Sequence, residues 1–142
     1  LDNIIQLINQ YLIDYSQYLG FEIQFVIDED GARKDIHQFI YKDNVIKPYT
    51  DLSGGQQQLV NVGTALAIID AVSSINGCNL ILMDEAFESL SQNSIEIVGD
   101  MLSYKAKEKN VILITHIPSF QPSNSYLIEL EISSNGTSMK LG

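Results

Sequence analysis

The sequence predicts an α/β fold in which helices flank a parallel sheet, and three observations lead to this expectation. A long apolar segment over residues 53–76 precedes two short apolar segments at residues 80–83 and 111–115. An amphipathic stretch with helical spacing separates these two segments, and continuous apolar strands are typical of parallel sheets covered on both faces. Strand-like alternation before and after this core predicts a preceding β-meander and a closing β-hairpin.

The chain opens with a predicted helix over residues 1–20, which ends at Gly20, where helices favour a left-handed residue. Its apolar residues follow the 4-3 spacing of a heptad seam: Leu1, Ile5, Ile8, Leu12, Tyr15 and Leu19. Further apolar residues beside this seam widen the stripe. Two interpretations therefore stand, an ordinary helix packed on a sheet and the end of a coiled coil.

From Phe21 onward the apolar period changes to two, which predicts half-buried strands. Residues rich in Asp, Asn and Gly separate the alternating runs and predict turns. The expected meander is strand, turn, strand, turn and short strand over residues 21–27, 28–31, 36–41, 42–44 and 45–47. Pro48 ends it.

The α/β core begins with a helix over residues 53–76, entered through Ser53 and two glycines and ended by Gly77. Because little of its surface is polar, we expect burial on more than one side. A second helix is expected over residues 92–109, with Asn93 and Glu96 as a capping pair and lysines near its negative end. Residues 125–132 and 137–141 predict the closing hairpin.

Composition limits the possible functions. The chain has 142 residues and a formal charge of −10, from 18 acidic and 8 basic residues. We therefore do not expect this segment alone to provide the main DNA-binding surface. Its single cysteine excludes an internal disulfide. We find no apolar run near the roughly 18–20 residues that span a bilayer, and no signal peptide, so we expect an intracellular protein. Because the first residue is Leu1, we expect the chain to be part of a longer protein.

Three short motifs at the ends of predicted elements carry residue types suited to phosphate chemistry. Glycines at a helix start let an anion approach bare backbone N–H groups at the positive end of the helix dipole. An aspartate that follows a central strand can hold magnesium, a glutamate beside it can polarise water, and a histidine after the next strand points to the same crevice. The residues concerned are Ser53, Gly54, Gly55 and Gln56, then Asp84 and Glu85, then His116.

Each motif alone also has a structural interpretation. Ser53 and the following glycines can be only a helix cap and a turn. An acidic pair after a strand is common in solvated loops, and a histidine at a strand end is common without any catalytic role. We interpret His37 and Cys78 as structural residues, because neither has companions of this kind.

As a set, the motifs resemble the C-terminal half of an ABC-type ATPase. Residues 52–56 look like the signature motif, and residues 80–85 look like Walker B with its catalytic glutamate. Residues 88–91 take the D-loop position, and His116 takes the switch-histidine position. The chain lacks a Gly-x-x-x-x-Gly-Lys-Ser/Thr loop, and its first helix looks like the last turns of a returning coiled coil. The best match is the C-terminal lobe of an SMC-like DNA-repair ATPase of the SbcC type.

This resemblance implies ATP and magnesium as cofactors and ATP hydrolysis that gates head engagement in a DNA recombination or repair complex. Asp84 would hold the magnesium ion through water, Glu85 would activate the hydrolytic water, and His116 would contact the γ-phosphate. The signature residues would bind the nucleotide held by an opposing head. They are Ser53, Gly54, Gly55 and Gln56.

The implied partners are an N-terminal Walker A lobe of the same protein, a second copy of the head in an ATP-dependent dimer, and an exonuclease subunit. DNA would bind mainly through other parts of the complex, and no membrane is implied. We expect residues 1–142 to form one signature and Walker B lobe, made of a helix or coiled-coil end (1–20), a meander (21–51) and an α/β part (52–142). We expect this lobe to be inactive alone.

The chain departs from the family pattern at two points. Ser91 replaces the D-loop aspartate, and the signature helix lacks the basic residue often found in repair enzymes. Both put the coupling of DNA binding to ATP in doubt. Two other functions stay open, an SMC-type chromosome clamp head without a nuclease and the nucleotide-binding subunit of an ABC transporter.

Overall fold

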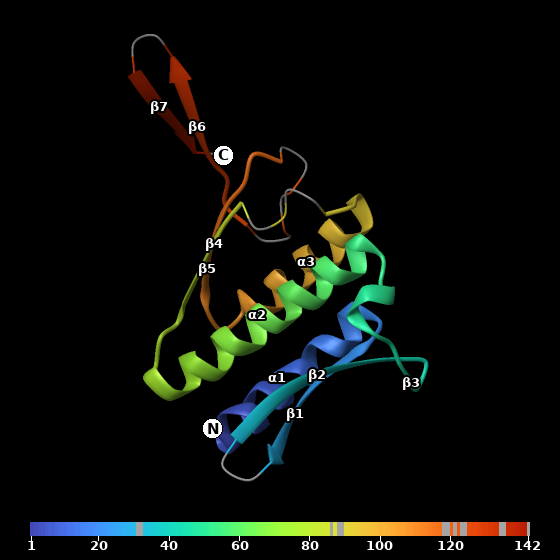
Figure 1. Ribbon diagram of the computed structural model, residues 1–142. Coiled ribbons are helices and arrows are strands. Elements are labelled where there is room, and N and C mark those ends of the chain that lie inside the picture. Colours follow the sequence, from blue (N-terminus) through green and yellow to red (C-terminus); the bar gives the residue numbers. More distant parts are fainter. Residues whose placement is uncertain are drawn as a thin grey trace.

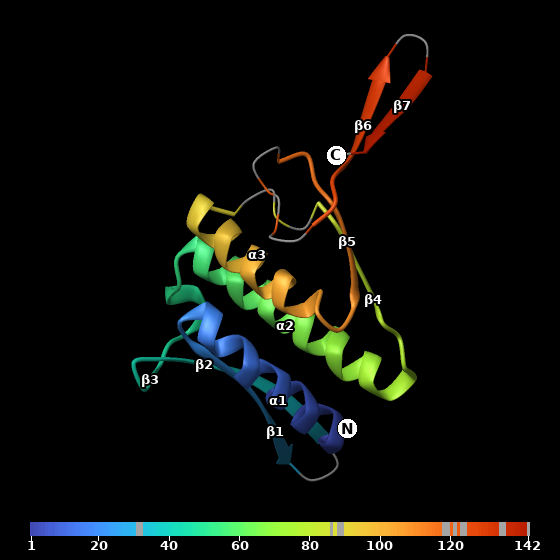
Figure 2. The ribbon, with the colours of Figure 1, turned by 180° about the vertical axis from the view of Figure 1, so that it is seen from behind.

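The helices of the chain form a layer between a meander sheet and a pair of parallel strands (Figures 1 and 2). The computed structural model describes residues 1–30, 33–85, 87, 90–117, 120, 122, 125–133 and 136–141. In chain order the elements are α1 (Asp2–Leu19), β1 (Glu22–Asp30), β2 (Arg33–Lys42), β3 (Val45–Ile46), the 3-10 helix η1 (Tyr49–Asp51), α2 (Gly54–Asn76), β4 (Leu80–Asp84), α3 (Gln92–Lys105), β5 (Asn110–Ile114), β6 (Ile128–Ser133) and β7 (Gly136–Leu141).

The described strands form three sheets, as expected for an α/β chain with a meander and a final hairpin. β1, β2 and β3 pair antiparallel in that order, β4 pairs parallel with β5, and β6 pairs antiparallel with β7. Both views draw the β6–β7 hairpin away from the helices (Figures 1 and 2). The predicted mixed fold and element order are confirmed.

Helix α1 packs its heptad seam inward, against α2 and β1. The buried residues of α1 are Ile5, Ile8, Leu12, Tyr15 and Leu19, whereas Leu1 is 59% exposed. Gly20 ends the helix in the left-handed conformation, with φ of 72°. This packing corresponds to the first of the two interpretations, an ordinary helix that covers a sheet.

The meander begins with a longer hairpin than the sequence predicts. Residues 28–30, expected as a turn, continue β1, and their partners are residues 33–35 of β2. Opposite charges across the strands support this extension, because Lys34 forms an ion pair with Glu29. Gly31 lies outside the described residues. The second predicted turn is confirmed: Asp43 and Asn44 both have positive φ, as a two-residue hairpin turn requires.

Helix α2 is buried by α1 on one side and by α3 on another, and it ends at Gly77 with φ of 72°. Contrary to the sequence-based expectation, α2 is long and apolar enough to cross a membrane, by length and composition alone. Half of its most apolar window is buried inside the protein, a property that core helices share. This accords with the predicted burial on more than one side.

Helix α3 is shorter than predicted and has a different cap. The helix ends at Lys105 rather than residue 109, and the Asn110 N–H then donates to the Asn79 carbonyl at 2.7 Å, which starts β5 beside β4. Ser91 is the N-cap, with its Oγ accepting from the Ser94 N–H, so the predicted pair of Asn93 and Glu96 is wrong.

The parallel strands are covered on one face only within the described residues, which corrects the expectation of two covered faces. Ile81 is 1% exposed and Met83 8%, and both face the helices. The alternate side chains are about half exposed: Leu80, Leu82, Ile112 and Ile114. The strands are apolar on both faces, as in a fully covered sheet, but the second face is open.

Candidate functional site

The first predicted motif forms a capping box at the start of α2. Ser53 Oγ accepts from the Gln56 N–H at 3.3 Å, and Gln56 Oε1 accepts from the Ser53 N–H at 3.1 Å. The structural interpretation of Ser53 as a helix cap is therefore confirmed. The N–H groups of Gly54 and Gly55 occupy the first two helical positions, where no carbonyl of the helix itself can reach them.

Gly55 allows the start of α2 to approach the start of α3. A Cβ at this position would lie 3.4 Å from Ser94 Oγ and 3.9 Å from Ser91 Oγ. Two helix N-termini with serine caps thus lie side by side, and their dipoles point positive ends toward the same region. An anion near Ser53 would meet the favourable field of both helices.

The second and third motifs meet at the carboxyl ends of β4 and β5. Asp84 pairs with Ile114 in the parallel register, and the next N–H, that of Glu85, donates to the Ile114 carbonyl at 2.9 Å. His116 follows β5 by two residues, and its Nδ1 lies 4.0 Å from Glu85 Oε1. The expectation that residues after neighbouring parallel strands share one edge is confirmed for this pair.

The backbone of Glu85 is unusual. Its φ is 49°, in the left-handed region that non-glycine residues rarely adopt. Such strain persists only where surrounding contacts impose it, and here the hydrogen bond to Ile114 fixes the peptide. Glu85 and His116 remain 61% and 65% exposed, so both side chains are accessible to a ligand or to water.

Asp84 can supply only one of the oxygen ligands that a magnesium site needs. It is an exposed carboxylate at the carboxyl end of a strand, a position suited to holding magnesium through water. No cluster of three or more metal-binding side chains occurs among the described residues. A magnesium ion beside Asp84 would therefore take its further oxygen ligands from water, phosphate or another segment.

The structure thus gathers the predicted residues into two groups. The first is the start of α2, whose capping bonds join Ser53 to Gln56, with the start of α3 beside it. The second is the strand edge with Asp84, Glu85 and His116. Two predicted D-loop residues, Glu88 and Ser89, lie outside the described residues.

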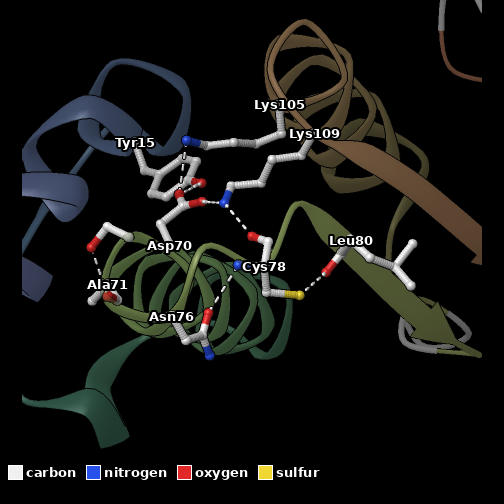
Figure 3. Close-up of polar contacts among 9 residues, drawn as sticks. Tyr15, Asp70, Ala71, Asn76, Cys78, Leu80, Lys105 and Lys109 are labelled. Carbon is white, nitrogen blue, oxygen red and sulfur yellow. Dashed lines mark hydrogen bonds and ion pairs between the residues drawn. The ribbon is translucent and has the colours of Figure 1, made fainter.

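A third polar group, in the core, was not predicted. Asp70 in the middle of α2 is 1% exposed and contacts Tyr15 of α1 and Lys105 of α3 (Figure 3). The sequence prediction treated Lys105 and Lys109 as residues that complement a helix dipole. The signal that reveals the cluster is an aspartate in an otherwise apolar helix, because a buried carboxylate needs partners.

Comparisons with known proteins identify the family. Residues 10–103 match the model of the "SbcC/RAD50-like, Walker B motif" family. A probable DNA double-strand break repair Rad50 ATPase of Aquifex aeolicus is 27% identical over 122 residues, which are 84% of this chain and 12% of that protein. A macrolide export ATP-binding/permease protein MacB of Psychrobacter cryohalolentis is 32% identical over 103 residues, 72% of this chain and 14% of that protein. The chain thus spans only a small part of the length of these relatives.

The fold of the chain also matches that of solved SMC ATPases. A structure from a study of ATP-driven dimerization and DNA-stimulated activation of SMC ATPases matches 98% of this chain and 85% of its own, with a TM-score of 0.77 and 17% identity. At that identity the match concerns the fold alone. The family match makes this chain a member of the SbcC/Rad50-like Walker B family, with the fold of an SMC-like ABC ATPase head lobe.

Proposed function

We propose that this lobe binds and hydrolyses ATP as half of a composite head, and that ATP binding drives head engagement in a DNA recombination or repair complex. The observation that carries the proposal is the strained Glu85, fixed to Ile114 and placed 4.0 Å from His116 at the edge of the parallel strands. Strain of this kind is characteristic of catalytic positions.

In this proposal each residue of the strand edge has its own role. Magnesium, when bound, neutralises charge on the phosphates. Asp84 would help to hold the ion, and Glu85 would accept the proton of the attacking water as general base. His116 contacts the γ-phosphate, and its Nδ1 lies 4.0 Å from Glu85 Oε1.

A separate Walker A lobe is required, because the chain contains no Gly-Lys-Ser or Gly-Lys-Thr sequence. The open face of β4 and β5 supports this part of the proposal. Parallel strands occur almost only with both faces covered, and two strands alone make a marginal sheet. The Walker A lobe would cover Leu80, Leu82, Ile112 and Ile114 and complete the site beside Asp84.

The start of α2 would serve the opposing head. Ser53 is exposed there, and the adjoining N–H groups of Gly54 and Gly55 are directed outward from the helix start. The side-by-side starts of α2 and α3 favour a phosphate from a second copy of the head, with Gln56 fixing the cap. An exonuclease subunit and DNA would be engaged mainly by other parts of the protein.

Two alternatives rest on specific observations. The similarity to a chromosome partition protein Smc of Methanococcus voltae favours a chromosome clamp head that works without a nuclease, and the similarity to MacB favours a transporter subunit. The sequence that adjoins Leu1 in the whole protein separates them. A long heptad region supports either coiled-coil protein and excludes the transporter.

The test compares the two adjacent acids in the protein that includes the Walker A lobe. Glu85→Gln removes the base but keeps the side-chain size, so turnover should fall by roughly 10²–10⁴-fold with ATP affinity unchanged and the heads held together. Asp84→Asn should weaken ATP binding as well, because it disturbs the ground-state metal site. Equal losses of ATP affinity in both variants would contradict the assignment of Glu85 as the base.

A further inference from the structure

Three helices meet at a single buried carboxylate (Figure 3). Tyr15 of α1 donates its hydroxyl proton to Asp70 Oδ2 at 2.6 Å, and Lys105 Nζ of α3 lies 2.8 Å from the same oxygen. Tyr15 is 0% exposed, Asp70 1% and Lys105 3%. One side chain of α2 is therefore joined by polar contacts to both neighbouring helices.

The second carboxylate oxygen of Asp70, Oδ1, has weaker polar contacts. Lys109 Nζ lies 3.8 Å from Asp70 Oδ1, and it also donates to the Cys78 carbonyl at 3.5 Å. Within the described part of the chain, Oδ1 has no hydrogen-bond partner. The cluster thus holds one buried acid with two lysines, a costly arrangement for a protein interior.

Aromatic rings enclose the Lys105 ammonium group. Its Nζ lies 5.5, 5.3 and 5.4 Å from the ring centroids of Tyr11, Tyr15 and Tyr104. Two of these rings belong to α1 and one to α3 itself. Burial and the Asp70 carboxylate also raise the pKa of Tyr15 above its ordinary value, so its hydroxyl stays protonated and keeps donating.

Stability alone does not explain such a cluster, because replacing a buried ion pair by apolar residues of similar volume is often neutral or favourable. Its effect on specificity is easier to explain. Helix α2 has apolar residues around its circumference, including the exposed Ile68, Val72 and Ile75, so hydrophobicity alone defines its rotation poorly. A single buried polar residue can select one packing among several, as in helical oligomers.

A close contact one turn further along α1 acts in the same direction. A Cβ on Gly63 would lie 2.8 Å from Leu19 Cδ1, so α2 and the end of α1 approach closely there. Together with the bond between Tyr15 and Asp70, this contact fixes both the rotation and the axial position of α2. Ser53 lies on the same helix, about 25 Å from Asp70 at 1.5 Å per residue.

We propose that Asp70, held by Tyr15 and Lys105, is a positioning residue that selects one orientation of α2 and thereby places the Ser53–Gly54–Gly55 start against α3. Its role in head association rests on the proposed function. Its role in placing the helix start does not.

The test replaces the cluster by apolar side chains of similar size in the protein that includes the Walker A lobe. The variant carries Tyr15→Phe, Asp70→Leu and Lys105→Met, in which methionine keeps the contacts with the rings. Lys107→Met is the matched control, since Lys107 is exposed and also lies over Tyr104. Three quantities are measured: the urea midpoint, the amide NMR signals of Gly54 and Gly55, and ATP-dependent head association.

We expect the triple variant to keep a urea midpoint at or above that of the wild type, yet to show shifted or multiple signals for Gly54 and Gly55. Head association should weaken roughly 10–100-fold, the size expected when a binding group is displaced by about 1 Å. The control should match the wild type in all three measurements. Wild-type signals and association in the triple variant would overturn the proposal.

Two further outcomes are also decisive. If the wild-type protein shows no ATP-dependent association, the proposed function fails, and the Gly54 and Gly55 signals alone decide this inference. If the triple variant does not fold, Tyr15→Phe replaces it, because it removes one contact and leaves the ion pair. Unchanged signals from the start of α2 in Tyr15→Phe would then refute the positioning role.

Discussion

Removal of the Tyr15 hydroxyl provides a direct measure of the buried cluster. Tyr15→Phe keeps the ring in the core and deletes only the donor to Asp70 Oδ2, which lies at 2.6 Å. Hydrogen bonds to charged groups are worth about 1.5–3 kcal/mol, and here the acceptor is 1% exposed, so water cannot replace the lost donor. We expect the free energy of unfolding at pH 7 to fall by about 2 kcal/mol.

The pH dependence supplies a second, independent signature. Burial and Asp70 raise the pKa of Tyr15 above its ordinary value of 10.0 in the folded protein. The contribution of this group is therefore complete well below pH 10 and decreases progressively as the pH rises above 10, because only the unfolded chain then releases the proton. One such group lowers the free energy of unfolding by about 1.4 kcal/mol at pH 11. The difference between wild type and Tyr15→Phe should thus shrink from about 2 to about 0.6 kcal/mol.

Urea unfolding at pH 7 to 11 measures both quantities. The control is Tyr126→Phe, since Tyr126 is 94% exposed, and its effect should stay within about 0.5 kcal/mol at every pH. Groups outside the Tyr15 cluster are common to the wild type and the variant, so their contributions cancel in the difference. A loss below about 0.5 kcal/mol for Tyr15→Phe, or a difference that does not change with pH, would refute the reasoning.

Two more variants test the packing and the helix start. Leu12→Ala should lower the free energy of unfolding by about 2–5 kcal/mol, because Leu12 is 1% exposed, whereas Ile13→Ala, at a site 70% exposed, should change it by less than about 0.5 kcal/mol in the same urea assay. Ser53→Arg should cost about 1 kcal/mol for the lost cap and abolish ATP-driven head association by filling the phosphate position, and Ser53→Ala should share the first effect only. Sedimentation equilibrium measures the effect of Ser53→Arg on ATP-driven head association. Normal dimers in this variant would show that the motif is a helix cap only.

Local signals account for the elements that the sequence predicted well. The seam of α1 and the left-handed Gly20 lie within one helix, and the capping box of α2 spans residues 53–56. The positions of Glu85 and His116 followed from a single rule about parallel strands. In each case the information lies within a few neighbouring residues or in the order of the elements.

Long-range contacts account for the rest. Tyr15 and Asp70 are 55 positions apart, so no local pattern in the sequence pairs them. The chain leaves α3 for a hydrogen bond from the Asn110 N–H to the Asn79 carbonyl, two residues that lie far apart in the sequence. The open face of the parallel strands was also not predicted. The sequence of an apolar strand is the same whether the segment that packs on it belongs to this part of the chain or not.

The half-exposed face of β4 and β5 has a consequence for the order of events during synthesis. Leu80, Leu82, Ile112 and Ile114 form an apolar strip beside strands with few partners, a combination that favours unwanted association while it is uncovered. With the proposed Walker A lobe as the cover, the lobe is most vulnerable between the folding of its own core and the docking of that cover. Rapid docking of the cover limits that interval, and a covering segment in the same polypeptide is always present at a high local concentration.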